Sequence, residues 1–209
     1  MAPLQKVAIL VTRRGPDGLE LLVFEHVDVP AGVQVPAGTV EPGEDVRVAA
    51  IRELMEETGI VVDDIDLLWV EEEIGIFGAL VSEKVALRAA PHADAEVVLD
   101  RIWALGVRVL ERTGAWARVA RDEYDLTVEP WRLLSSLEGW LPAAALVPSQ
   151  TRHVFHAHAP ADVADSWDVW AEDAYTFRMR WVPPHDSGLV SPHQAWVDRA
   201  LPLLTAREA

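Results

Sequence analysis

The sequence contains no cysteine and no long apolar run, and it is short of basic residues. The missing cysteine excludes disulfides and thiolate metal sites and fits a reducing compartment, so we expect a cytoplasmic protein. The apolar run near the start spans only five residues and is followed by Arg13 and Arg14, which is the wrong length and order for a signal peptide. No stretch approaches the roughly 20 apolar residues of a membrane span.

The shortage of positive charge limits the partners that the protein can bind. Lys and Arg number 18 against 34 Asp and Glu, which gives a formal charge of −16. Because affinity for duplex nucleic acid comes mainly from basic side chains that neutralise phosphates, this composition argues against a duplex partner. An anionic substrate would need a cation to mediate its binding. Half of the 209 residues are apolar, which is enough for a substantial core.

Strand patterns flank one clear helix. Residues 6–14 and 19–26 are rich in β-branched and aliphatic side chains around a Gly-Pro-Asp-Gly turn, which predicts a hairpin. Residues 46–58 predict a helix, with Asp45 as its N-cap and Gly59 at its C-terminal end. Further strands are expected near 65–77, 152–159 and 176–182, and a closing helix near 191–204.

The predicted helix is amphipathic. At about 100° per residue, Val48, Ile51, Leu54 and Met55 share one arc, and Glu53, Glu56 and Glu57 lie opposite. Carboxylates three and four residues apart raise each other's pKa unless a cation neutralises them, and hard oxygen ligands suit Mg²⁺ or Mn²⁺. The alternative is an acidic flank that simply faces solvent.

The residues around this helix decide between the two interpretations. Gly38, Glu44 and the run Arg52-Glu53-Leu54-Met55-Glu56-Glu57-Thr58-Gly59-Ile60 resemble the signature of the Nudix hydrolases, G-x5-E-x7-R-E-U-x-E-E-x-G-U with U aliphatic, at each of its nine specified positions. The resemblance implies a hydrolase that cleaves a nucleoside diphosphate linked to another moiety, or a nucleoside triphosphate, to a nucleoside monophosphate.

The same resemblance assigns roles by position. Glu56 and Glu57 are expected to be the principal ligands of Mg²⁺ or Mn²⁺, with the Gly38 carbonyl as another, and Glu53 as a base or further ligand. Arg52 is expected to orient a neighbouring glutamate, Glu44 to hold the loop or act in the outer shell, and Gly59 to be structural. The general base often lies in the second half of such chains, where Glu172 and Asp173 are the candidates; a turn with two solvated acids is the alternative.

The implied fold is α+β: an α/β/α sandwich around a mixed sheet. Residues 79–147 resemble a bacterial Src-homology-3-type (SH3-like) barrel inserted between a first part, 1–78, and a second part, 148–209. In such a small barrel Trp103 and Trp116 are expected in the core, and the interval 120–138 as an extended loop. The alternative is a β-rich elaboration of the Nudix sheet.

Two functions follow. The first is a metal-dependent pyrophosphohydrolase with a small-molecule nucleotide substrate and neither duplex nucleic acid nor membrane as partner. The second is a nucleotide-sensing module whose inserted barrel recruits a protein or peptide. The sequence does not determine the oligomeric state.

Overall fold

The computed structural model describes residues 4–170 and 175–207. By their contacts the residues form two compact units, one comprising Met1–Gln5, Glu71–Tyr124 and Arg132–Arg152, and the other Lys6–Val70, Asp125–Trp131 and His153–Ala209. We call them the β unit and the helix unit. No helix in the described part of the chain is both long and apolar enough to cross a bilayer.

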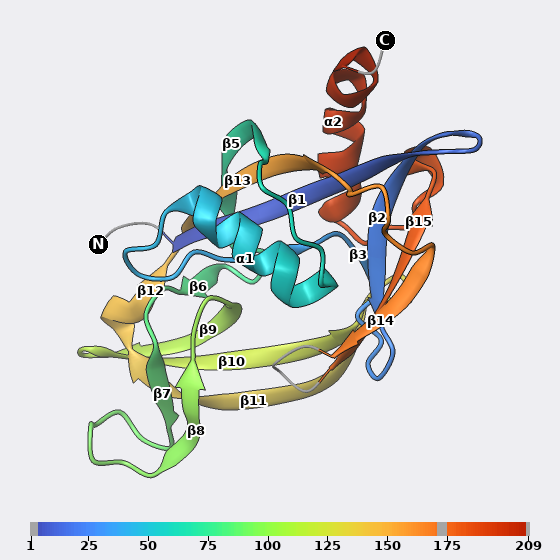
Figure 1. Cartoon of the computed structure of the whole chain (residues 1–209). Coiled ribbons are helices and arrows are strands. Elements are labelled where there is room, and N and C mark those ends of the chain that lie inside the picture. The colour runs from blue at the N-terminus through green and yellow to red at the C-terminus, as the bar shows by residue number, and fades with distance from the viewer. Residues whose placement is uncertain (1–3, 171–174, 208–209) are drawn as a thin grey trace. The chain divides into compact units, whose positions relative to one another are not determined.

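The helix unit is built on a sheet with the strand order β14-β15-β2-β1-β13-β5, in which β3 also pairs with β2 and β4 with β1 (Figure 1). The predicted hairpin is confirmed, with Gly15 opposite Gly18 at its turn. The strands of this sheet have these bounds: β1 Leu4–Gly15, β2 Gly18–His26, β3 Val33–Gln34, β4 Ala37–Thr39, β5 Asp66–Ile74, β13 Ser149–His158, β14 Ser166–Trp170 and β15 Thr176–Val182.

The two helices cover opposite faces of this sheet. Alternate residues of a strand point to opposite faces, so Val7, Ile9 and Val11 pack in one core cluster with the helix α1, Val46–Thr58. Ala8 and Leu10 pack in a second cluster with the closing helix α2, His193–Arg207. The helix unit is therefore the α/β/α sandwich that the sequence predicts.

The β unit contains a second sheet with the order β12-β6-β9-β10-β11-β7-β8 and its own core cluster. The order is an open path that ends at β12 and β8, so the expected closed barrel is not confirmed. The strands have these bounds: β6 Ala79–Val81, β7 Val85–Arg88, β8 Val97–Ile102, β9 Gly106–Thr113, β10 Trp116–Asp125, β11 Arg132–Pro142 and β12 Leu146–Val147.

Two expectations about this sheet are wrong. The interval 120–138 is not one extended loop, because β10 runs to Asp125 and β11 begins at Arg132. Trp103 and Trp116 are only partly buried and lie outside the core cluster, and the Lys84 Nζ lies 4.3 Å from the Trp103 ring centroid. Aliphatic residues such as Leu87, Ile102 and Leu141 fill the core instead.

Candidate active site on the acidic helix

Helix α1 begins and ends where the sequence predicts. The Asp45 side chain accepts hydrogen bonds from the backbone N–H groups of Arg47 and Val48, at 2.9 and 3.3 Å. At the other end, Gly59 adopts a left-handed conformation with φ of 74°, and its N–H donates to the Met55 carbonyl at 2.8 Å. These caps fix the length of the helix and therefore the register of its glutamates.

The buried face of α1 is not the predicted one. Val48 and Met55 are 57% and 48% exposed, whereas Ala49 and Ala50 are fully buried beside Leu54. Small side chains let the helix backbone approach the sheet closely, so packing selects the alanines over the larger apolar residues. As a result, Glu53 and Glu57 lie next to the sheet and are partly buried.

Arg52 is the centre of the carboxylate cluster. Its Nε and Nη2 donate to both oxygens of Glu44, at 2.9 and 3.0 Å, and Nη2 also donates to the Thr39 carbonyl at 3.0 Å. Its Nη1 donates to Glu53 and to Glu56, each at 2.9 Å. All three guanidinium nitrogens are thus engaged, and the hydrogen bonds to Glu44 raise the pKa of Arg52.

Glu44 ties the loop before α1 to this arginine. Besides both Arg52 contacts, its Oε2 accepts the N–H of Glu41 at 2.8 Å, and its own N–H donates to the Glu41 carbonyl at 3.0 Å. Hydrogen bonds from Arg52 hold the pKa of Glu44 below its ordinary value, so this carboxylate is ionised at neutral pH. Glu44 therefore holds the loop before α1 in place.

Glu53 lies against the backbone of β4. Its Oε1 accepts the N–H of Thr39 at 3.0 Å, and a Cβ added to Gly38 would overlap the Glu53 carboxyl group. Only glycine fits at position 38 without displacing this side chain. Burial raises the pKa of Glu53, although the hydrogen bonds from Arg52 oppose the shift.

Glu57 is the one carboxylate of the four without an arginine partner in the described part of the chain. Its Oε2 accepts the N–H of Ala37 at 2.9 Å. Burial raises the pKa of Glu57 well above its ordinary value, the Ala37 N–H opposes this, and the charges of Glu53 and Glu56 add to it. A cation arriving at this position would therefore be strongly favoured.

The donor set fits a hard divalent cation in its chemistry. Three carboxylates share the Arg52 guanidinium, Glu57 lies beside them, and oxygen is the ligand atom that Mg²⁺ and Mn²⁺ prefer. Among the residues described, no three carboxylate or histidine side chains are placed to hold one ion as they stand. Arg52 lies between the carboxylates of Glu44, Glu53 and Glu56, so these side chains would have to turn toward an ion to share it.

Two candidates for the general base come from the second half of the chain. Glu172 and Asp173 fall outside the described residues. The other acidic run, Glu71–Glu73, has structural contacts: Glu73 accepts from Arg152 Nε and Gln150 Nε2, each at 2.7 Å, and Glu72 accepts from the Ser149 hydroxyl at 2.5 Å. A role in strand pairing explains this run.

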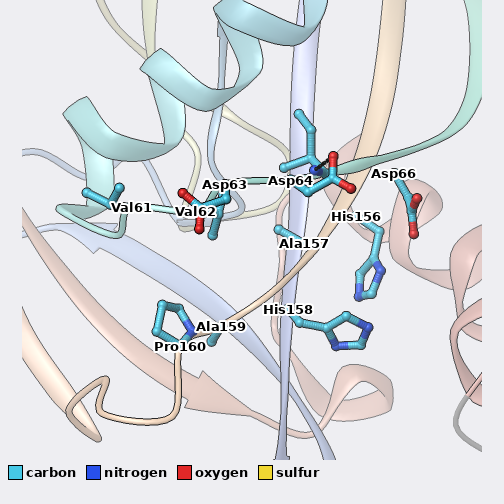
Figure 2. A pocket seen from close by; sticks show the side chains of 11 residues that line it. Val61, Val62, Asp63, Asp64, Asp66, His156, Ala157, His158, Ala159 and Pro160 are labelled. Carbon is cyan, nitrogen blue, oxygen red and sulfur yellow. Dashed lines mark hydrogen bonds between the residues drawn. The ribbon is translucent and has the colours of Figure 1, made fainter.

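His156 and His158 of β13 line a different cavity, of about 300 Å³, together with residues 61–66 (Figure 2). His156 and His158 share a strand face, with their ring centroids 4.6 Å apart, and His153 does not line the cavity. His156 is buried, and its Nε2 lies 2.8 Å from the Thr12 hydroxyl.

Sequence reasoning missed the backbone partners of the glutamates. Ala37 and Thr39 hold Glu57 and Glu53 through main-chain N–H groups, and the Thr39 carbonyl accepts from Arg52. Any residue type supplies these groups, so no side-chain pattern reveals them. The spacing of Gly38 from the helix was the available signal.

Comparison with known proteins identifies this element. Residues 3–98 match the family model described as NUDIX domain. This segment of the chain is therefore similar to a Nudix domain. The nine signature residues lie within the matched segment, on β4, the loop after it, helix α1 and the two residues that follow the helix.

Individual relatives match around short segments. The chain is 54% identical over 35 residues to the RNA pyrophosphohydrolase of Dinoroseobacter shibae, which is 17% of this chain and 22% of that protein. It is 47% identical over 45 residues to Nudix hydrolase 25 of Arabidopsis thaliana, which is 22% of this chain and 26% of that protein. The chain thus spans about a quarter of the length of these curated relatives.

Among solved structures, the chain resembles the NUDIX domain of Shewanella oneidensis NrtR complexed with ADP ribose. The TM-score is 0.47 and the sequence identity 12%, over 98% of this chain and 90% of that one.

Proposed function

We propose that this protein is a metal-dependent Nudix pyrophosphohydrolase that cleaves a nucleoside diphosphate linked to another moiety, or a nucleoside triphosphate, to a nucleoside monophosphate. The observation that carries the proposal is the gathering of Glu44, Glu53 and Glu56 around Arg52 of a capped helix, with Glu57 beside them. An acidic flank facing solvent would not have a partly buried Glu57 with a strongly raised pKa. That arrangement costs stability and is explained by a bound cation.

In the proposed site Glu53, Glu56, Glu57 and the Gly38 carbonyl would hold Mg²⁺ or Mn²⁺. A cation held there would neutralise charge on the pyrophosphate and lower the pKa of a water molecule. Arg52 holds Glu53 and Glu56 in position through Nη1, and Glu44 fixes Arg52 and the loop. Glu53 is the base candidate on the helix, because burial raises its pKa and so makes it a stronger base than an exposed glutamate. Glu172 is the alternative base.

The inserted segment supports a second, separate proposal. We assign residues 79–147 as an SH3-like module that recruits a protein partner, between the parts 1–78 and 148–209 of the Nudix domain. Support comes from the antiparallel pairing of its strands and from a core cluster of its own, which includes Val81, Leu87, Val107 and Leu141.

The test of the hydrolase is a product assay on purified protein with Mg²⁺ or Mn²⁺. Nucleotide sugars, dinucleoside polyphosphates, ADP-ribose and nucleoside triphosphates are the substrates to screen. Glu57→Gln should lower kcat/KM by more than about 100-fold, since the loss of residues that only support a metal ligand already costs 10- to 100-fold. Chelation of the metal should abolish turnover.

The matched control is Glu123→Gln in the β unit, which removes an exposed carboxylate paired with Arg121 and should leave turnover unchanged. A nucleotide sensor would bind these compounds and release no product with either protein. That result would overturn the hydrolase and favour the binding module.

A further inference from the structure

A cavity of about 410 Å³ at the end of β2 is separate from the cavity of the β13 histidines. Its wall includes Thr127, in the segment between β10 and β11. The neighbouring Leu126 N–H donates to the Pro30 carbonyl at 2.9 Å, and the buried Asp125 accepts the Thr127 N–H at 3.0 Å and its hydroxyl at 2.5 Å. The polar groups that line the cavity come from Glu25, His26, Asp28 and Thr127.

His26 joins this cavity to an aromatic cluster. Its ring centroid lies 4.6 Å from that of Phe177 and 5.5 Å from that of Tyr175, both nearly edge to face. Phe24 and Phe177 are buried, whereas Tyr175 is 38% exposed. The cluster therefore offers an accessible aromatic surface beside polar groups, as in sites that hold planar heterocycles.

The Nδ1 atom of His26 is shielded from solvent and has no hydrogen-bond partner among the described residues. Burial lowers the pKa of His26, and the charge of Asp28 opposes this, so the ring is neutral at pH 7 and has one donor and one acceptor nitrogen. A buried ring nitrogen without a partner is uncommon, and a ligand in an adjoining cavity is one explanation for it.

The cavity lies within reach of the carboxylate site. His26 follows Phe24 by two residues on β2 and so shares its sheet face, and Phe24 belongs to the core cluster of Leu54 on α1. Val33 lines the cavity, and Ala37, four residues further on, donates to Glu57. Four residues span at most about 14 Å, which a nucleoside diphosphate can bridge.

We propose that this cavity holds the base of the substrate and selects bases with an exocyclic amino group. This inference rests on the proposed function and names part of its substrate. The Glu25 and Asp28 carboxylates accept hydrogen bonds from an amino group, while the neutral His26 ring has an N–H that can donate to a ring nitrogen of the base. In a base with a carbonyl in place of the amino group, the carbonyl oxygen would face the Glu25 and Asp28 carboxylates. Both are hydrogen-bond acceptors, so no hydrogen bond would form there.

The test compares adenosine and inosine forms of the same compound, since they differ by that amino group. The pairs are ADP-ribose with its inosine analogue, and ATP with ITP. We expect kcat/KM to favour the adenosine form by about tenfold or more. His26→Ala and Asp28→Asn should each raise KM for the adenosine form about tenfold and leave kcat within about twofold, because they act on binding and not on the phosphorus.

Matched controls are His185→Ala and Asp17→Asn, which remove an exposed imidazole and an exposed turn carboxylate of the same unit and should leave KM unchanged. If His26→Ala is poorly folded by circular dichroism, His26→Gln replaces it. Equal kcat/KM values for the adenosine and inosine forms would contradict the base site. A fall in kcat of the His26 and Asp28 variants without a change in KM would contradict it as well. Neither result would contradict the hydrolase proposal.

If wild type hydrolyses neither form, the hydrolase proposal fails and binding decides the base site separately. Calorimetric titration should then show AMP binding at least about tenfold more tightly than IMP, with the preference lost in Asp28→Asn. Equal affinity for AMP and IMP, or no binding of either, would overturn it.

Discussion

The two units of the molecule treat negative charge in different ways. The helix unit has 9 Lys and Arg against 23 Asp and Glu, a net charge of −14, whereas the β unit has 9 against 11, a net charge of −2. In the β unit, acids and arginines of the sheet pair singly: Arg108 with Asp122, Arg118 with Glu138, and Arg121 with Glu123. In the helix unit three carboxylates, those of Glu44, Glu53 and Glu56, contact Arg52, and within the described residues the neighbouring Glu57 has no arginine partner.

The comparison distinguishes carboxylates that only pair on the surface from carboxylates that are gathered at a functional site. Exposed single pairs contribute little to stability and are screened by salt. A partly buried excess of carboxylates is costly, and it persists only where something compensates for it. The excess on α1 therefore points to function more strongly than the net charge of the whole chain does.

The largest effect on stability should come from Arg52. Arg52→Ala removes the partner of three carboxylates and the Thr39 carbonyl, so we expect the free energy of unfolding to fall by about 3 kcal/mol in urea titrations. Arg52→Lys keeps the positive charge but loses the planar, forked donor group of arginine. The free energy of unfolding of this variant should lie between those of wild type and Arg52→Ala. A loss below about 1 kcal/mol would mean that the cluster behaves like the surface pairs of the β unit.

Glu57 should give a smaller, pH-dependent effect. Because its pKa is raised in the folded state, the metal-free protein loses stability as the pH rises above the unfolded value of about 4.3 and through the folded pKa. Glu57→Gln removes that loss, so at pH 7 the metal-free variant should melt a few degrees above wild type, at about 2–4 °C per kcal/mol. Near pH 4 the two should melt together.

Thermal melts at both pH values, with chelator and with excess Mg²⁺, check this prediction. Mg²⁺ should raise the melting temperature of wild type and have less effect on the variant, because binding to the folded state alone stabilises it. A lower melting temperature for metal-free Glu57→Gln at pH 7 would contradict the raised pKa.

The smallest effect should come from the β unit. Arg118→Ala breaks a pair with Glu138 in which both side chains are 44% exposed, so we expect a change below about 1 kcal/mol that disappears in high salt. Urea titrations at low and high salt measure it. A loss as large as that of Arg52→Ala would remove the contrast between the units.

The sequence predicts the parts of the fold that follow from local chemistry. The caps of α1 and the Gly15–Gly18 turn were placed correctly, because their residue types determine the backbone locally. The buried face of α1 was predicted incorrectly, because Ala49 and Ala50 pack closely against the sheet while Val48 and Met55 are exposed to solvent. Which side of an apolar helix packs depends on a surface that comes from distant strands.

The candidate site divides in the same way. Fixed spacing identified the four glutamates and Arg52, since a helix places residues three and four apart side by side. His26 and the cavity beside it escaped notice, because Thr127 comes from a segment about a hundred residues away in sequence. The strand at 132–142 was missed in part because residues 132–136 are all exposed, on both faces of the strand, so they show no alternation of apolar and polar side chains.

The hydrogen bonds of Arg52 have a dynamic consequence. One guanidinium group joins β4 through Thr39, the loop through Glu44, and α1 through Glu53 and Glu56. None of these segments can swing away without breaking contacts that also restrain the others, so they should open together or not at all. Amide hydrogens along residues 37–58 should then exchange with a common opening free energy, as one cooperative unit.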